Sequence, residues 1–584
     1  MAFVVKKKIN NNDYYYLNEN KRDSETGKVK TKTLAYLGKV KKDADKKAKE
    51  IIKKMEEEKT EEIVEREEKK LGVVNDIREV HSSESKEFIS FVREAGFIWG
   101  PEPEIYGGLA GFYTYGPLGK LLKNKVENSV RKIFNSHGFR ELEAPTVLPD
   151  IVWKASGHLD TFSDRTIKCS KCDAIFRADK IIEEKYDVAA DAFSEEKLLS
   201  FIKEKNIKCP NCKSYFEEKI ESQSLMMKTV VAGQDAALRP ETATATYIPY
   251  LRFYNYFRKK LPLGVFQIGK AYRNEISPRQ SVLRGREFTQ AEGQIFVDPE
   301  FKNNWDKYDS IKKDVLPFFD YESQDDESGP KNISIEEALK KGFIKSQAYG
   351  WCIWLAHKQF VGFGIPNDRI RLRQHHPDEK AFYADDAWDI EVKLNNYGWT
   401  EVCGVHDRTD YDLKQHAKFS NTKLEAIREN GEKFVPHVLE IAFGTDRPTY
   451  ALIDLFYDKK EITEGKTVFR IPPHMAPIDV SIFPLLKTEN LIEFAQEIKS
   501  DLEKEFIVDY DSSGSIGKRY LRSSSAGVPF AITVDEESLK NKDVTVRERD
   551  TTKQIRVPIS DLKNILRNLI FGEIDFEKAG VLVN

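Results

Sequence analysis

The chain has few cysteines and no long apolar run, and these two absences narrow its class. Only 6 of its 584 residues are cysteine, which argues against a small disulfide-stabilised scaffold. No window approaches the ~20 apolar residues that a helix needs to cross a bilayer, so no membrane partner is expected. The first residues, MAFVVKKKINNN, lack the apolar core of a signal peptide. We therefore expect a cytoplasmic protein.

The chain also lacks a strong excess of either charge. Its formal net charge is −3, so the composition gives no global sign of nucleic-acid binding. A large enzyme can still bind RNA through local basic patches. Hydrophobic residues make up 40% of the sequence, which is enough for several cores. The length predicts about three to four domains.

Four of the six cysteines form two close pairs, Cys169-x2-Cys172 and Cys209-x2-Cys212. Each pair has the spacing that clamps one side of a tetrahedral Zn²⁺ ion in a reducing compartment. Four thiolates fill the coordination shell, so the predicted zinc is structural rather than catalytic. The alternative is four unrelated buried thiols.

Residues 1–80 differ from the rest of the chain in composition. Residues 1–54 contain 16 Lys and Arg against 7 Asp and Glu, and Tyr14, Tyr15 and Tyr16 stand in a β-rich segment. A Lys- and Glu-rich helix is expected over residues 43–70. Two interpretations remain open. The segment is either an appended RNA-contacting ribbon of basic and aromatic side chains, or a solvated charged extension.

The stretch of residues 265–297 is the most informative in the chain. It predicts a strand over 265–276, a polar loop over 277–284 and a second strand over 285–297. Because side chains alternate across a strand, one face of this hairpin collects arginines and carboxylates around a single phenylalanine. The side chains assigned to this face or its mouth are Arg273, Glu275, Arg284, Arg286, Phe288, Gln290 and Glu292. The pattern is typical of a site that holds a charged ligand.

A second arginine signal comes later in the chain. Residues 434–456 predict a strand, a turn and a helix, with Arg447 in the first helical turn. A cation there opposes the helix dipole unless an anion such as phosphate is bound at that end. Glu401, between Trp399 and Gly404, is a candidate carboxylate in a tight pocket.

The remaining segments carry weaker signals. His375, His376 and Glu379 lack the spacing of the usual zinc motifs, so hydrogen-bonded architecture is favoured over a metal there. Residues 477–584 alternate strands with helices, which predicts a separate open mixed sheet.

Three motifs in order resemble those of class II aminoacyl-tRNA synthetases. The segment HGFRELEAPTVLPD resembles motif 1, FQIGKAYRNEISP…RGREF resembles motif 2, and the stretch ending FGTDR resembles motif 3. The segments SGHLDTF, LRPETA, RLRQH and GWTEV resemble the homodimeric glycyl-tRNA synthetases of archaea and eukaryotes. The resemblance runs from about residue 88 to the C-terminus.

This resemblance implies an α+β fold with several parts. A class II catalytic core on an antiparallel sheet is expected over 85–458, with a zinc-binding insertion at 165–222 and a helical insertion at 300–365. An α/β anticodon-binding domain follows at 470–584. Residues 1–80, a basic β-hairpin plus charged helix, lie outside it and resemble the start of some transposases.

The resemblance also implies an activity and its residues. A homodimer would activate glycine with ATP and Mg²⁺ to glycyl-adenylate, releasing diphosphate, and transfer glycine to the 3′ end of tRNA(Gly). The implied catalytic residues are Arg273 and Arg447. The implied ATP-binding residues are Arg273, Asn274, Glu275, Arg284, Gly285, Arg286, Phe288, Glu401, Val402 and Arg447. The implied glycine-binding residues are Arg239, Glu241, Glu292, Glu401, Glu440, Ile441 and Ala442.

The chain departs from the family pattern at two places. Glu440-Ile441-Ala442 replaces the family's Glu-Pro-Ser, and Ser524 and Ser525 replace an acidic pair in the tail. Two alternatives are therefore kept. One is a related class II synthetase for another small amino acid, and the other is a catalytically inactive nucleic-acid-binding relative. Such relatives lose their ATP-binding arginines, which are present here.

Overall fold

The computed structural model divides the chain into two compact units, Met1–Arg78 and Glu79–Asn584. It describes residues 2–583 apart from 10–11, 23–28, 44–45, 49–85 and 458–467, and the single or short gaps 184, 187, 189, 191–192, 277, 279, 378 and 381–383. Most of the charged helix expected over 43–70 therefore lies outside the described residues. Within the described residues, no helix is long and apolar enough to cross a membrane.

The first unit contains a three-stranded antiparallel sheet in the order β1-β2-β3. The strands are β1 (Ala2–Ile9), β2 (Asn12–Arg22) and β3 (Val29–Gly38). The sequence predicted a two-stranded ribbon here, and the structure adds a third strand at its edge.

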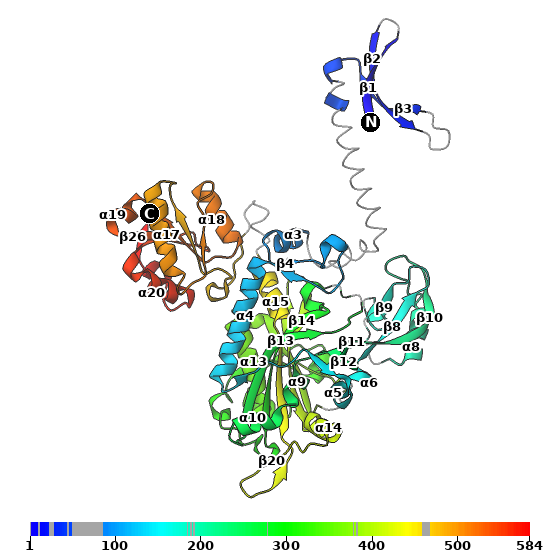
Figure 1. Ribbon diagram of the computed structural model, residues 1–584, viewed down its shortest axis with the longest axis vertical. Helices are drawn as coiled ribbons and strands as arrows, with labels where there is room; N and C mark the ends of the chain where they lie inside the picture. The colour runs from blue at the N-terminus through cyan, green and yellow to red at the C-terminus, as the bar shows by residue number, and fades with distance from the viewer. Residues whose placement is uncertain are drawn as a thin grey trace. The chain divides into compact units, whose positions relative to one another are not determined.

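The second unit is built on a nine-stranded sheet (Figure 1). Two of its strand pairs, β13 with β6 and β15 with β17, are parallel, and the other neighbours are antiparallel. In spatial order the strands are β16 (Lys331–Ser334), β15 (Val315–Phe319), β17 (Ile370–Gln374), β18 (Asp386–Leu394), β19 (Gly398–Thr409), β22 (His437–Gly444), β14 (Glu287–Val297), β13 (Leu263–Tyr272) and β6 (Arg140–Glu141). Strand β6 lies at the edge of the sheet, a few residues before Pro145, where the missing N–H of a proline is tolerated.

Alternation along β14 separates the two faces of this sheet. Ala291 and Ile295 point into the main core, where the helices α4 (Pro117–Ser136), α13 (Gln347–Gly362) and α15 (Asp446–Phe456) pack. Helix α4 presents Leu122, Val126, Val130 and Phe134, spaced four residues apart, to that core. The opposite face of β14 is left for polar side chains.

Shorter elements cover one end of this polar face. Helices α9 and α10 pack with parts of β13, β14 and β22 in a second cluster, and α14 contacts α9. The elements around them are β4 (Ile98–Trp99), β5 (Thr114–Tyr115), β7 (Val147–Pro149), α5 (Asp150–Ala155), α6 (His158–Thr161), β11 (Met227–Val231), β12 (Gln234–Leu238), α9 (Ala243–Tyr247), α10 (Tyr250–Tyr256), α14 (Tyr411–Ser420), β20 (Ala426–Ile427) and β21 (Lys433–Phe434).

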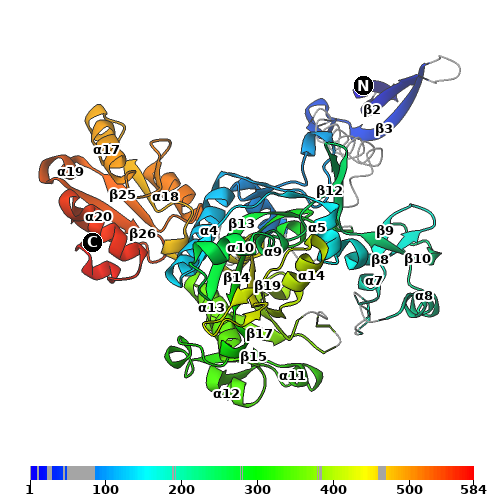
Figure 2. The same cartoon turned by 60° about the horizontal axis from the view of Figure 1, so that its bottom comes forward.

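Residues 300–365, expected to form a helical insertion, instead belong to the main sheet and core. They supply two of its strands, β15 and β16, and the buried helix α13. Figure 2 draws β15 together with α11 (Tyr321–Asp325) and α12 (Ile335–Lys340) at the end of the sheet beyond β17. Their polar loops hid the two short strands in the sequence.

The cysteine-bearing segment forms a small sheet of its own in the order β10-β8-β9. Its strands are β8 (Ser163–Cys169), β9 (Ile175–Arg177) and β10 (Phe216–Ser224). Helix α8 (Glu195–Glu204) buries Leu198 and Ile202 against this sheet. Helix α7 (Lys180–Glu183) completes the segment.

The C-terminal part is a six-stranded mixed sheet, as the alternation of strands and helices predicted. Its strand order is β24-β23-β25-β26-β27-β28, and it has a separate hydrophobic core. The elements are β23 (Val480–Pro484), α17 (Glu489–Leu502), β24 (Val508–Tyr510), α18 (Ile516–Ser525), β25 (Phe530–Val534), α19 (Glu536–Asn541), β26 (Asp543–Glu548), β27 (Gln554–Pro558), α20 (Ile559–Ile570) and β28 (Val581–Val583).

Candidate active site

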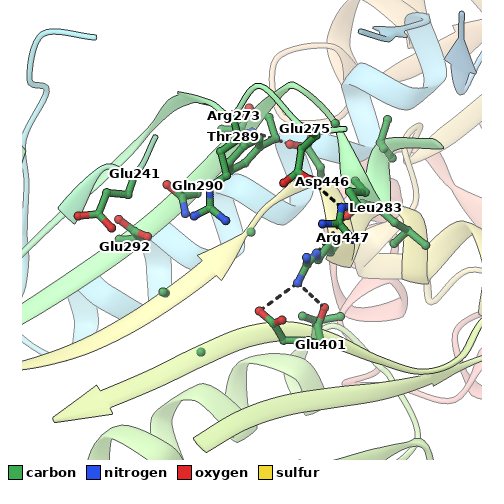
Figure 3. Close-up of a pocket in the computed structure, with 18 of the residues that line it drawn as sticks. Glu241, Arg273, Glu275, Leu283, Thr289, Gln290, Glu292, Glu401, Asp446 and Arg447 are labelled. Carbon is green, nitrogen blue, oxygen red and sulfur yellow. Dashed lines mark hydrogen bonds and ion pairs between the residues drawn. The ribbon is translucent and has the colours of Figure 1, made fainter. Parts of the chain in front are cut away.

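A cavity of about 430 Å³ opens on the polar face of the nine-stranded sheet (Figure 3). Its floor comes from β14, β19 and β22, and its rim comes from the loop of the β13–β14 hairpin and the start of α15. The lining residues are Glu241, Arg273, Glu275, Val282, Leu283, Arg284, Gly285, Phe288, Thr289, Gln290, Glu292, Glu401, Val402, Gly404, His406, Arg408, Glu440, Ala442, Gly444, Asp446 and Arg447.

The hairpin that encloses this cavity is shorter than the sequence predicted. Strand β13 ends at Tyr272 and β14 begins at Glu287. Beyond Tyr272, the Arg273 amide still donates across the hairpin to the Arg286 carbonyl oxygen at 2.9 Å, but the Asn274 amide donates to the Leu225 carbonyl oxygen at 2.8 Å. The predicted alternation on β14 is confirmed, since Phe288, Gln290 and Glu292 all line the cavity.

Arginines surround one end of the cavity. Arg273 lies 5.3 Å from the Phe288 ring and 5.4 Å from the Phe162 ring, and its Nε donates to the Pro240 carbonyl oxygen at 3.1 Å. Arg284 Nε donates to the buried Glu275 carboxylate at 2.9 Å. Each guanidinium keeps further N–H donors that can bind phosphate oxygens.

Arg447 closes the cavity from the opposite side. Its NH1 group contacts the Glu401 carboxylate at 3.0 Å, and its Nε donates to the Leu283 carbonyl oxygen at 3.2 Å (Figure 3). The helix that carries it is fixed by Asp446, which accepts the Thr289 amide at 2.5 Å and also pairs with Lys123 of α4. Arg447 is therefore held by backbone and ion-pair contacts across the rim.

Three buried or nearly buried carboxylates, Glu241, Glu292 and Glu440, gather at the other end. Glu241 contacts His158 Nε2 at 3.4 Å. Figure 3 places the Glu241 and Glu292 carboxylates beside each other. A concentration of negative charge at this depth is expensive unless a cation is bound there.

The carboxylates differ in how they are compensated. Burial raises the pKa of Glu440, but Arg408 and His406 outweigh it and set the pKa to about 2. Burial also raises the pKa of Glu241, but His158 outweighs it and the net direction is downward. Burial, followed by the charges of Glu440 and Glu241, raises the pKa of Glu292 to about 8.

Glu292 is thus the uncompensated member of the group. It accepts the Thr242 hydroxyl, and among the described residues no Lys, Arg or His lies within ion-pairing distance of it. A small ligand cation such as an ammonium group would satisfy it. The site therefore joins an anion-binding end to a cation-binding end.

Four of the residues implied by the resemblance lie outside the cavity lining. The Arg239 guanidinium is buried and donates to the carbonyl oxygens of Lys270 (2.7 Å) and Ala144 (3.0 Å). Arg286 donates to the Ala110 carbonyl oxygen at 2.9 Å, which supports the neighbouring loop. The other two are Asn274 and Ile441.

The structure adds lining residues that sequence reasoning missed. Arg408 pairs with Asp412 at 2.8 Å and with Glu440 at 3.3 Å, and His406 also contacts Glu440 at 3.3 Å. With Gly404, these residues share one face of β19, so the period-two pattern in GVHDR was the available signal. His158 and Asp446 lie in the segments SGHLDTF and FGTDR, which were noted for their resemblance, but no role was assigned to either side chain.

The three polar residues considered as a possible zinc motif are bonded to other partners. His375 Nε2 contacts Asp389 at 2.9 Å, and Glu379 pairs with Arg373 at 2.8 Å. His376 lies 3.9 Å from Asp325. 

The four cysteines of the two pairs meet around one point. Their sulfur atoms all lie within 4.8 Å of one another, with Cys169 Sγ 3.4 Å from Cys212 Sγ and Cys172 Sγ 3.7 Å from Cys209 Sγ. Four sulfurs bonded to one tetrahedral Zn²⁺ at ~2.3 Å would lie about 3.8 Å apart. The donor set and its spacing therefore fit a four-cysteine zinc ion.

Comparison with protein families identifies three parts of the chain. Residues 231–456 match the tRNA synthetase class II core domain (G, H, P, S and T), and residues 479–569 match the anticodon binding domain. Residues 4–68 match the N-terminal domain of IS1634 family transposases, in agreement with the predicted resemblance. The sheet, its charged cavity and these matches define the class as a class II aminoacyl-tRNA synthetase.

Individual relatives narrow the family. The glycine–tRNA ligase of Methanothermobacter thermautotrophicus is 38% identical over 560 residues, covering 82% of this chain and 98% of the relative. Those of Pyrococcus furiosus and Methanococcus maripaludis are each 38% identical, covering 82% and 81% of this chain and 98% and 97% of the relative. The chain belongs to the glycine–tRNA ligase family.

Proposed function

We propose that the protein activates glycine with ATP and transfers it to the 3′ end of tRNA(Gly). The observation that carries this proposal is the polarity of the cavity, with arginines at one end and three carboxylates at the other. ATP brings phosphates to the arginine end, and the glycine ammonium goes to the carboxylate end. The carboxylate of glycine then lies between them.

The first step is a displacement at phosphorus. A glycine carboxylate oxygen forms a bond to the α-phosphorus of ATP, the bond from that phosphorus to the bridging oxygen breaks, and diphosphate leaves with the electron pair. Such a step needs alignment and positive charge more than a side-chain base. Arg273 supplies that charge at the α-phosphate, and Arg284 and Arg447 bind the nucleotide from the rim.

The adenine base fits between an aromatic ring and a guanidinium. Phe288 projects from the floor of β14, and Arg447 projects from α15 across the cavity. Glu275 and Val402 line the same part of the cavity and are assigned to the ATP site. Mg²⁺ bound to the phosphates would neutralise developing charge. Glu401 is better placed to hold that ion than Glu440, since Glu440 is buried beside Arg408 while the Glu401 side chain is 51% exposed.

We assign glycine selection to a row of three residues that lie side by side on neighbouring strands. Glu292 on β14, Ala442 on β22 and Gly404 on β19 are direct neighbours across the sheet. A Cβ atom on Gly404 would come within 2.6 Å of the His406 ring. The row is small at its centre and negative at its edge, which suits an amino acid without a side chain. One extra methyl group changes binding in an apolar pocket by about 1–3 kcal/mol, so rejection of alanine must be steric.

The cysteine cluster is proposed to hold a structural zinc ion. Cys169 and Cys209 are buried at the base of β8 and beside α8, so the ion would tie the two halves of this segment together. No position is left open on the ion for a substrate.

We also propose that two copies associate. The loop before α4 exposes Ile105 (87%), Tyr106 (78%) and Leu109 (52%), more apolar surface than a short solvated loop needs. Analytical ultracentrifugation of the parent and an Ile105→Ser/Leu109→Ser variant tests this. The variant should sediment as a monomer, and a dimer of unchanged stability would refute this surface as the interface.

The amino acid is tested by ATP–pyrophosphate exchange with a panel of glycine, alanine, serine, threonine and proline. Exchange should depend on glycine alone. Exchange with one of the others would favour a different class II synthetase. Exchange with none, in protein that still binds RNA, would favour a catalytically inactive relative.

A further inference from the structure

The N-terminal sheet has one covered face and one aromatic face. Tyr15, Leu17 and Leu37 are buried on the covered face together with Ala48. Because side chains alternate along each strand, Tyr14 and Tyr16 of β2 point to the other face. These residues lie within the described part of the first unit.

Three tyrosines form a cluster on the aromatic face. The Tyr36 ring lies 5.3 Å from the Tyr16 ring and 6.3 Å from the Tyr14 ring, and register places Tyr36 opposite Tyr16. Tyr36 is 52% exposed. Buried aromatic rings are explained by core packing, whereas large aromatic rings grouped on an exposed surface indicate a binding site.

Lysines flank this cluster. Lys7 Nζ lies 5.3 Å from the Tyr16 ring centre, and Lys39 Nζ lies 5.2 Å from the Tyr14 ring centre. The surrounding sequence is basic, with 16 Lys and Arg against 7 Asp and Glu over residues 1–54. The face therefore offers π-surfaces beside positive charge.

This combination matches the chemistry of an unpaired nucleic-acid strand. Bases stack on exposed aromatic rings, and phosphates attract neighbouring lysines. In a double helix the faces of the bases are covered by neighbouring base pairs, so they cannot stack on the tyrosine rings. The basic charge favours an anionic partner, and the exposed rings favour a nucleic acid over an acidic protein because bases stack on them.

We propose that Tyr14, Tyr16 and Tyr36 form a stacking platform for unpaired nucleotides of RNA, with Lys7 and Lys39 contacting the adjacent phosphates. The RNA in question is the tRNA substrate, so this assignment of the partner rests on the proposed function. The platform adds affinity for tRNA, and glycine activation takes place in the other unit.

The test uses the full chain and a fluorescein-labelled oligouridylate RNA, with binding followed by anisotropy. The Tyr14→Ser/Tyr16→Ser/Tyr36→Ser variant should bind at least about 100-fold more weakly, since the loss of each ring weakens binding roughly five- to 150-fold and three rings are removed. The matched control, with Phe at the same three positions, keeps the rings and should bind like the parent. The Tyr36→Ser variant, changed at an exposed position only, should bind at least about fivefold more weakly. It tests the proposal even if the triple variant does not fold.

The lysines have a separate readout. The Lys7→Ala/Lys39→Ala variant should reduce the slope of log affinity against log salt by roughly 1.4, at about 0.7 for each phosphate contact on a single strand. Tyr256→Ser, a 70% exposed tyrosine in the second unit, should leave oligouridylate affinity unchanged.

Three results would overturn the proposal. They are parent-like binding by the Ser variants, equal binding to duplex RNA of the same length, or tighter binding to a single-stranded DNA of matched sequence. Glycine-dependent pyrophosphate exchange is measured on the same variants and should not change. If the Ser variants lose oligouridylate binding while the parent itself shows no glycine-dependent exchange, the platform stands and the proposed function is refuted. If the parent shows that exchange but the Ser variants bind oligouridylate as the parent does, the proposed function stands and the platform is refuted.

Discussion

Glycine binding is expected to depend on pH through Glu292. The ligand-free pKa of this carboxyl is about 8, because burial and then the charges of Glu440 and Glu241 favour its protonated form. At pH 7 roughly nine in ten copies carry a proton. Each must lose it before the carboxylate can pair with the glycine ammonium.

The size of the effect follows from that pKa. Apparent glycine affinity should fall about tenfold for each pH unit below 8, or about 1.4 kcal/mol per unit. From pH 8.5 to 6.5 the apparent dissociation constant should rise roughly 25-fold. Calorimetry at pH 7 in phosphate and in Tris should detect the release of about 0.9 proton per glycine bound.

Glu292→Gln separates this carboxyl from other titrating groups. The variant should flatten the profile and weaken glycine binding at pH 8.5 by about 10- to 100-fold, since a charge-assisted hydrogen bond is worth ~1.5–3 kcal/mol. Glu287→Gln is the matched control, because Glu287 lies on the same strand and pairs at the surface with Lys270 at 2.9 Å. A flat profile in the parent, or a retained pH dependence in Glu292→Gln, would refute the reasoning.

The same shift has a consequence for stability, with a definite sign. The folded-state pKa of Glu292 lies above its ordinary value, so its contribution to stability is fully present below about pH 4.5 and is lost as pH rises towards about 8. Glu292→Gln should therefore have a higher Tm than the parent at pH 8.5 and little difference at pH 5. Thermal melts at both values check this, and a lower Tm at pH 8.5 would contradict it.

Three further changes test other parts of the site. Arg273→Ala should reduce pyrophosphate exchange by about 10²–10³-fold, as expected for loss of a preorganised charge at the reacting phosphate, while circular dichroism stays unchanged; near-normal exchange would argue against its role. Ala442→Ser should place a hydroxyl donor beside Glu292 and lower the pKa of that carboxyl, which would move the pH profile of glycine binding to lower pH. An unchanged profile would show that the hydroxyl does not interact with Glu292. Cys172→Ser should lower the zinc content from one ion per chain to near zero and make residues 163–224 sensitive to protease, whereas full zinc content would show that the cysteines do not bind it together.

Local patterns predicted the parts of the site that lie on one strand. Phe288, Gln290 and Glu292 follow from alternation along β14, and Arg447 follows from the turn before α15. The residues that the site draws from elsewhere have no such pattern. His158 reaches Glu241 from a segment more than 80 positions away in the sequence, a contact that only the tertiary fold creates.

The same limit applies to the fold. The β13–β14 hairpin and the strands and helices of the C-terminal sheet were predictable because their partners are close in sequence or strongly amphipathic. Strands β15 and β16 were missed because they are short and flanked by polar loops, and their place at the sheet depends on pairing with β17. The family resemblance assigned Arg286 and Arg239 to ligands, whereas their guanidinium groups donate to backbone carbonyl oxygens.

The order of strands in the large sheet also sets when the cavity can come into existence during synthesis. Strand β14 pairs on one side with β13, which precedes it directly, and on the other side with β22, which begins only at His437. At about 5–20 residues per second, the ribosome takes roughly 7 to 28 s to move from the end of β14 to that point. Throughout that interval one edge of β14 is open to solvent and to other chains. A nascent chain that stalls between these strands carries the β13–β14 hairpin without β19 and β22, so its open edge is exposed to pairing with other chains before the cavity has formed.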